Sequence, residues 1–191
     1  APGEKIYQRG ASRVSINQDV PVIMLTQTYA PKGLMGSLFE INKTELSVSK
    51  RFWLSAFGYI DGIVKTGHIW SSVPYPYLMF PNANLSYTIQ PESFALLNPM
   101  EFVTDSYASW DITYWANGAI FNYIPYFNKL KLREVFSFRG VWGHLSSKNN
   151  PSENTDLFQF PAVSNTQALS STPYMEAGVG IDNIFRMLRL D

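Results

Sequence analysis

The sequence predicts an all-β protein, and more narrowly an antiparallel transmembrane β-barrel of which this chain forms the C-terminal part of a larger barrel. The first supporting observation is the stretch Leu130–Gly143, where apolar and aromatic residues alternate with a set that carries three cations. Side chains of a strand point alternately to opposite faces. A strand that crosses a bilayer at a tilt needs about 9–11 residues, with lipid on one side and a polar lumen on the other. This stretch meets both conditions.

Composition is the second observation. The chain has 191 residues, a length that favours one domain, and is 46% hydrophobic, 15% aromatic and only 16% charged. Soluble domains usually carry about 25% charged residues. The deficit suits a surface that faces lipid, although a β-sandwich with a carbohydrate-binding face would share it. The formal net charge of zero argues against a nucleic-acid partner, which requires a positive footprint.

Several protein classes are excluded outright. The chain has no cysteine, which removes disulfides, thiolate metal sites and cysteine nucleophiles. No apolar run approaches the roughly 18–20 residues of a spanning helix, so a helical membrane protein is also excluded.

The strands are predicted from period-two alternation and from the abundance of aromatic, β-branched and hydroxyl residues. Residues 1–19 are expected to form an N-terminal segment or loop, and residues 20–191 the barrel strands. The predicted strands, in chain order, are Val20–Ala30, Phe39–Ser55, Tyr59–Trp70, Glu101–Trp115, Leu130–Gly143, Pro173–Ile181 and a seventh within Ile184–Leu190. Seven strands are one fewer than the eight of the smallest common barrel, so closure requires residues or a chain beyond these.

The connections are the third observation. Two of them are long and polar, about residues 71–100 and 145–172, and the others are shorter. Counting antiparallel strands up and down places both long connections at the same end. Outer-membrane barrels have short periplasmic turns and long external loops. We therefore expect both long connections to be external loops.

The alternation also assigns side chains to faces. The predicted lumen residues, which would form a charge network, are Arg51, Asp111, Arg133, Arg139 and Glu176. The predicted lipid-facing residues are Leu132, Phe136, Phe138 and Trp142. Structural bracing is favoured over catalysis, which needs two adjacent carboxylates with a perturbed pKa. Glu134 and Lys50 fall on otherwise apolar faces and are expected at membrane boundaries, because a charge at mid-bilayer is costly.

Candidate chemistry is sparse. His68 and His144 lack a second ligand at metal-binding spacing, and no cofactor or metal motif occurs, so neither is expected. A barrel phospholipase would need a Ser/His pair at the membrane edge, for which His144 with Ser146 and Ser147 is the candidate. Aromatic residues cluster beside most predicted turns, which favours the interfacial girdles of a barrel over a sugar-binding platform.

Several motifs together resemble a known family. They are Val73-Pro74-Tyr75-Pro76-Tyr77-Leu78, Asn84-Leu85-Ser86-Tyr87, Phe94-Ala95-Leu96-Leu97-Asn98, Glu101-Phe102-Val103-Thr104-Asp105, Asn117-Gly118, Ile124-Pro125, Lys129-Leu130-Lys131-Leu132-Arg133-Glu134-Val135 and Tyr174-Met175-Glu176-Ala177-Gly178-Val179-Gly180-Ile181-Asp182-Asn183. From about Val20 to its last residue the chain resembles a family of Bacteroidetes outer-membrane proteins of unknown function. Members resemble a carboxypeptidase-regulatory-like domain followed by a barrel distantly related to BamA-type assembly factors.

The resemblance implies a fold and a location without an agreed activity. Two departures are the missing regulatory-like domain and the end of the chain where members continue with further strands. Phe138-Arg139-Gly140 has the letters of an Arg-Gly loop motif but lies in a predicted strand, so that role is not transferred.

The expected function is non-enzymatic: a pore, scaffold or envelope-assembly component in a bacterial outer membrane. The expected partners are outer-membrane lipid and either other envelope proteins or the missing part of the same barrel. The alternative is a soluble all-β carbohydrate-binding module.

Overall fold

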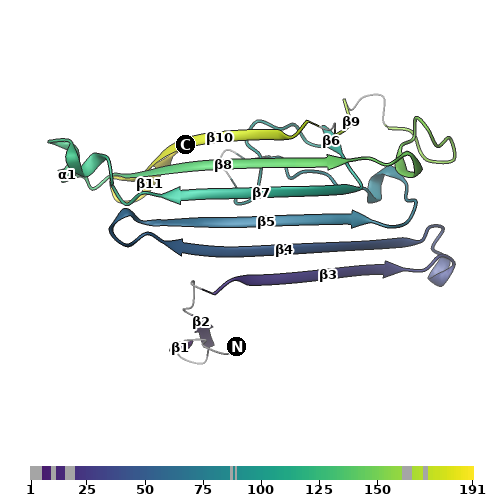
Figure 1. Ribbon diagram of the computed structural model, residues 1–191, viewed down its shortest axis with the longest axis horizontal. Coiled ribbons are helices and arrows are strands. Elements are labelled where there is room, and N and C mark those ends of the chain that lie inside the picture. The colour runs from purple at the N-terminus through teal and green to yellow at the C-terminus, as the bar shows by residue number, and fades with distance from the viewer. Residues whose placement is uncertain are drawn as a thin grey trace.

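The computed structural model describes residues 6–9, 12–15, 20–86, 88, 90–160, 165–169 and 172–191. Its main element is a seven-stranded sheet in the spatial order β11-β10-β8-β7-β5-β4-β3, with every pairing antiparallel (Figure 1). The strands are β3 (Val22–Ala30), β4 (Ile41–Trp53), β5 (Tyr59–Ile69), β7 (Ser106–Trp115), β8 (Arg133–His144), β10 (Tyr174–Ile184) and β11 (Leu188–Leu190). The predicted all-β antiparallel class is confirmed. The sheet is open, with β3 and β11 as its edges.

The sheet is a meander, because successive long strands pair with one another. Apart from the three-residue β11, its strands are 9–13 residues long. Tyr, Trp, Phe, Val, Ile, Ser and Thr dominate these strands, and such residues fit a pleated surface. Their pairing registers are continuous, with an irregularity only between β10 and β11.

The predicted strand Leu130–Gly143 begins three residues later than expected, at Arg133. The four residues Phe127–Leu130 instead form a short helix, α1, and Lys131 adopts a left-handed conformation with φ of 55°. The Nδ2 group of Asn183 donates a hydrogen bond of 2.7 Å to the Lys131 carbonyl and holds this turn. Leu132 therefore lies in the connection that precedes β8, and its assignment to a strand face was wrong.

The predicted strand Glu101–Trp115 is divided into two. Phe102–Val103 forms β6, which pairs in parallel with β9 (Gln167–Ala168), and β7 starts only at Ser106. The seventh strand, β11, begins only at Leu188, because positive φ angles at Phe185 and Arg186 turn the chain between β10 and β11.

The two ends of the sheet are unequal. Residues 31–40, 70–105 and 145–173 connect strands at one end, which we call the loop end. Residues 54–58, 116–132 and 185–187 connect them at the other, which we call the turn end. In Figure 1 the loop end is on the right and the turn end on the left. Both long connections leave the loop end, as the strand count predicted.

The hydrophobic core lies chiefly at the loop end, in and beneath the long connections. One cluster consists of Ile69, Val73, Leu78, Met79, Val103 and Leu145, and a second of Phe94, Leu97, Val141 and Leu169. Most of these residues belong to the two long connections or to the strand ends beside them. The connections are therefore packed structure with a core of their own.

Smaller elements complete the description. Ile6–Arg9 (β1) and Ser12–Ser15 (β2) pair antiparallel in a separate sheet within the region predicted as a segment or loop. Short 3-10 turns occur at Leu34–Gly36 (η1), Ser55–Phe57 (η2), Tyr75–Tyr77 (η3), Phe121–Tyr123 (η4) and Ser147–Asn149 (η5). Among the described residues, the structure holds no helix with the length and apolar character of a membrane span.

Candidate functional site

The two faces of the sheet differ in chemistry. Residues paired in register share a face, so the pairings define each face directly. One face, which we call the covered face, carries the polar residues Thr26, Glu45, Ser47, Ser49, Arg51, Asp61, Lys65, Ser109, Asp111, Thr113, Ser137, Arg139 and Glu176, together with apolar residues such as Val22, Met24, Ile63 and Val141. The opposite face, which we call the open face, carries Ile23, Leu25, Leu46, Val48, Phe52, Ile60, Val64, Ile112, Tyr114, Phe136, Phe138, Trp142, Met175 and Val179.

Ion pairs cross the covered face between neighbouring strands. Arg139 of β8 lies opposite Asp111 of β7, with Nε 3.0 Å from Oδ2, and the two side chains are only 12% and 16% exposed. Arg51 of β4 binds Asp61 of β5 through two parallel hydrogen bonds of 2.6 and 2.7 Å. Paired guanidinium and carboxylate groups fix the relative positions of the strands that carry them.

Part of the long connection 71–100 folds back across the covered face. Lys65 of β5 forms an ion pair with Glu92 of this segment. Arg139 donates a hydrogen bond of 2.9 Å from Nη1 to the Ser93 carbonyl. In Figure 1 this part of the chain is the teal trace behind β7 and β8. The segment leaves the loop end, and part of it lies against the sheet.

A third attachment comes from Glu176 of β10. Its two carboxylate oxygens each accept a hydrogen bond of 2.8 Å, one from the Ala95 amide and one from the Leu96 amide. The Tyr174 hydroxyl donates to the same carboxylate at 2.7 Å. A carboxylate that accepts backbone amides binds more strongly than a neutral acceptor. Side chains from β5, β8 and β10 therefore hold one connection.

A cavity of about 420 Å³ remains between the segment and the covered face. Its charged lining residues are Lys43, Glu45, Lys65, Glu92, Asp111 and Arg139. Each cation lies against a carboxylate, since Lys43 Nζ is 2.9 Å from Glu45 and the other two pairs are those described above. The arrangement is that of a polar, braced interior.

The five predicted lumen residues all lie on the covered face, but they do not join into one network. Asp111 and Arg139 meet, whereas Arg51 binds Asp61. Glu176 lies opposite Arg139 in register, yet its carboxylate is directed to backbone amides. Arg133 lies further along β8, opposite Asp182 at the turn end.

Apolar side chains are exposed on the open face. Ile23, Leu25, Phe52, Val64, Ile112, Phe138, Trp142, Met175 and Val179 each have a relative exposure of 40% or more. Of the predicted lipid-facing residues, Phe136, Phe138 and Trp142 lie on this face. Lys50 also lies on it, and its ammonium is 4.8 Å from the centre of the Phe52 ring.

At the loop end, a buried carboxylate joins the two long connections. Asp105 is fully buried and accepts hydrogen bonds from the Ser146 amide and hydroxyl, from Asn149 Nδ2 at 2.9 Å and from the Ser106 hydroxyl at 3.3 Å. Asn149 Oδ1 in turn accepts the Val73 amide at 2.9 Å. Burial alone would raise the pKa of Asp105, but these hydrogen bonds outweigh it and hold the pKa below its ordinary value.

The histidines and serines do not form a hydrolytic triad. His68 Nδ1 lies 2.6 Å from the Ser106 hydroxyl, which is itself bonded to Asp105, so a serine stands between histidine and carboxylate. In a triad the histidine bridges the other two. His144 pairs in register with Ser106, while Ser146 donates to Asp105. Within the described ranges, no group of three or more His, Asp or Glu side chains could hold a metal ion.

Sequence reasoning did not identify three of the acidic residues that organise this site. They are Asp61, Glu92 and Asp105. Asp61 could have been found by pairing the second and third predicted strands through their short turn, because that register places it opposite Arg51. The others bind connections whose path the alternation does not specify.

Comparison with known protein families gives a match over most of the chain. The model of a family described as "Family of unknown function (DUF5686) C-terminal domain" matches residues 1–152. No curated protein and no solved structure matches the chain.

Proposed function

We propose that this chain forms one wall of a transmembrane β-barrel in a bacterial outer membrane. The chain belongs to the DUF5686 C-terminal domain family, a family of unknown function. The open face meets lipid and the covered face lines the lumen. The proposed role is non-enzymatic, as a pore, scaffold or envelope-assembly component. On the motifs quoted above, the proposal extends to a Bacteroidetes envelope and to a barrel related to BamA-type factors.

The observation that carries the proposal is the inverted polarity of the sheet. In a soluble protein the long connections would pack against the apolar face and leave the polar face in water. Here the segment 71–100 covers the ion pairs, and the apolar face stays exposed across β3, β4, β5, β7, β8 and β10. Monomeric soluble proteins rarely expose apolar patches of more than a few hundred Å². Lipid is the solvent that makes this arrangement favourable.

The order of the rows on the open face, apolar in the middle and aromatic at the outer rows of β8, supports the same proposal. Phe136 and Trp142 lie on the outer rows of its apolar band and are six residues apart in β8, which corresponds to about 20 Å along the strand. Outer-membrane barrels have strands tilted by about 35–45° and an apolar band about 25 Å tall, bordered by aromatic girdles, so this length along the strand covers about 15 Å of that height. Beyond Trp142 the next row toward the loop end is polar and consists of Gln27, Thr44, His68, Ser106 and His144.

The open sheet sets one requirement on the proposal. An unpaired strand edge does not occur in the hydrocarbon region of a membrane, because its backbone groups would lack hydrogen bonds. In the described part of the chain, β3 and β11 are such edges. The proposed barrel is therefore completed by further strands, either of the same barrel or of another envelope protein.

The position of the segment 71–100 across the covered face favours a scaffold or assembly role over an open channel. The segment is held to three strands across the face that would line the lumen, and the two cavities beside it have volumes of about 420 and 480 Å³. An open channel would require this segment to leave the covered face.

Two adjacent residues of β7 give the sharpest test. Ile112 is on the open face, whereas Thr113 is on the covered face beside Asp61 and Asp111. Ile112 lies in the register row of Lys50, which is two strands away and has its ammonium over the Phe52 ring, so Ile112→Arg adds a second cation to this row, at a cost of up to the about 2–4 kcal/mol of the bilayer centre. We expect Ile112→Arg to block insertion, and Thr113→Arg to insert because carboxylates lie beside it. Insertion is measured by outer-membrane fractionation and heat-modifiable gel migration.

The proposal fails if the unmodified protein is monodisperse in water without detergent, as a soluble carbohydrate-binding module would be. It also fails if Ile112→Arg inserts as well as Thr113→Arg.

A further inference from the structure

The connection between β7 and β8, residues 116–132, is much longer than the other two at the turn end. It contains η4 and α1, and the rings of Phe121 and Phe127 stack with centroids 5.5 Å apart. A simple turn between adjacent antiparallel strands needs as few as two residues. The extra length has therefore been built into a small folded unit.

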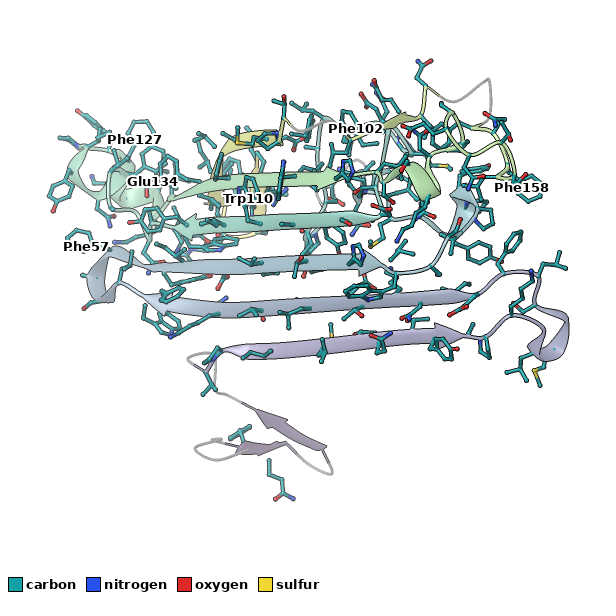
Figure 2. The ribbon with its side chains drawn as sticks, turned by 45° about the vertical axis from the view of Figure 1, so that its right-hand side comes forward. Phe57, Phe102, Trp110, Phe127, Glu134 and Phe158 are labelled. Atoms are coloured by element: carbon teal, nitrogen blue, oxygen red, sulfur yellow. The ribbon has the colours of Figure 1, made fainter. Side chains whose placement is uncertain are left out.

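This unit is fixed to the open face. Glu134 of β8 lies on the same side of the sheet as Phe136, and its Oε1 accepts hydrogen bonds from the Ile120 amide at 3.0 Å and the Phe121 amide at 2.5 Å. The Glu134 side chain is almost fully buried beneath the connection. Figure 2 shows Glu134 and Phe127 together at the end of the sheet that also carries Phe57. The connection is thus continuous with the apolar surface of the open face.

The exposed surface of the connection has the composition of a membrane interface. Tyr123 and Tyr126 are 83% and 84% exposed, and Ile120, Ile124, Phe127 and Leu130 are exposed as well. Lys129 and Lys131 are its only charged residues, so the segment carries two cations and no carboxylate. Tyrosines concentrate at the level of lipid headgroups. Interfacial segments combine such apolar side chains with lysines that attract anionic lipids.

We propose that residues 116–132 bind the lipid surface at the turn end, with their aromatic side chains at the headgroup–acyl boundary and their lysines toward anionic headgroups. The inference rests on the proposed function, because it requires the open face to meet lipid. It adds a specific lipid-binding element to that wall, with a preference for anionic lipid. The buried Glu134 acts as a positioning residue that holds the element on the lipid side of the sheet.

Site-directed spin labelling tests this cleanly, because the chain has no native cysteine. Single cysteines are introduced by Tyr123→Cys and Leu130→Cys in the connection, by Val64→Cys in the middle of the open face and by Ser152→Cys in an exposed part of the loop end. Each labelled protein is reconstituted into liposomes of phosphatidylethanolamine and phosphatidylglycerol. Collision rates of the label with oxygen and with a water-soluble nickel complex give its depth.

We expect the Val64→Cys label deep in the hydrocarbon, the Ser152→Cys label in water and both connection labels at the boundary between them. Replacing phosphatidylglycerol by phosphatidylcholine should make the connection labels shallower and leave the Val64→Cys label unchanged. Connection labels as exposed to nickel as that of Ser152→Cys, with the Val64→Cys label still deep, would overturn this inference alone and indicate a protein-binding surface. A Val64→Cys label in water would overturn the proposed function as well.

Discussion

The two faces of the sheet are formed by the same strands but differ in which side chains they carry and in how these are covered. On the covered face, charged groups are paired across strands, and the segment 71–100 binds Arg139 of one such pair. On the open face, side chains such as Val64 and Val179 are 54% and 68% exposed, although they are apolar. The alternation of residues sets this contrast, but the folded-back connection decides which face is the interior. The predictions below test that difference, beginning with the largest expected effect.

The ion pair of the covered face should be the most costly contact to break. Replacing Arg139 by Leu leaves Asp111 as a mostly buried carboxylate without its main cation. Removing one partner of a buried pair costs about 3–5 kcal/mol. The free energy of unfolding, measured by denaturant titration of the refolded protein in detergent, should fall by about this amount. Arg189→Ala removes a more exposed pair with Asp191 and should cost less than about 1 kcal/mol. Equal losses would show that the covered face is not an interior.

Two glycines test packing on the open face. A Cβ at Gly140 would come within 2.2 Å of the Trp110 ring, whereas a Cβ at Gly62 would meet only a backbone oxygen at 3.9 Å. Gly140→Ala should therefore destabilise the sheet by about 1–3 kcal/mol through overpacking. Gly62→Ala should leave the melting temperature nearly unchanged. Thermal unfolding followed by Trp fluorescence compares the two, and an unaffected Gly140→Ala protein would mean that Trp110 does not cover this glycine.

Weakening the attachment of the segment 71–100 should reduce the free energy of unfolding by a smaller amount. Glu176→Gln retains one oxygen but loses the charge that binds the Ala95 and Leu96 amides. Hydrogen bonds to charged groups contribute about 1.5–3 kcal/mol, so a partial loss of about 1–2 kcal/mol is expected. Amide hydrogen exchange at these two residues should accelerate, while exchange in β4 stays unchanged. Unchanged exchange at Ala95 and Leu96 would exclude Glu176 as an anchor.

The smallest effect on the free energy of unfolding near neutral pH is expected from the titration of Asp105. The pKa of Asp105 is lower in the folded state than in the unfolded state, so its contribution to stability is fully present above its ordinary pKa of about 4. That contribution is lost as the pH falls through the lower folded-state pKa. The pH profile of unfolding should therefore be flat near neutrality and steep in acid. Asp105→Asn should flatten the acid part, and an unchanged profile would remove Asp105 from this role.

The sequence specified the sheet better than the paths of its connections. A period of two assigns Arg139 and Phe138 to opposite faces, because a slip of one residue would exchange every side chain between them. The same reasoning extended β8 back to Leu130, since Leu132 and Lys131 continue the alternation while local turn geometry ends the strand.

The candidate site could be predicted only in part. Arg139 and Asp111 were both assigned to the polar face, and their pairing follows from the register of β7 and β8. The Pro and Asn residues of the segment 71–100 predict a loop but do not indicate where it packs. Asp105 was read as part of a strand because Phe102 and Val103 precede it. Contacts between residues distant in sequence leave no periodic signal.

The three anchors of the segment 71–100 have a consequence for the order of folding. The segment precedes β8 and β10 in the chain, yet Arg139 and Glu176, which hold it, belong to those later strands. It cannot complete its contacts until both strands have joined the meander. The covered face therefore stays accessible until β10 has paired with β8, and the packing of the segment is completed only after this part of the sheet has formed.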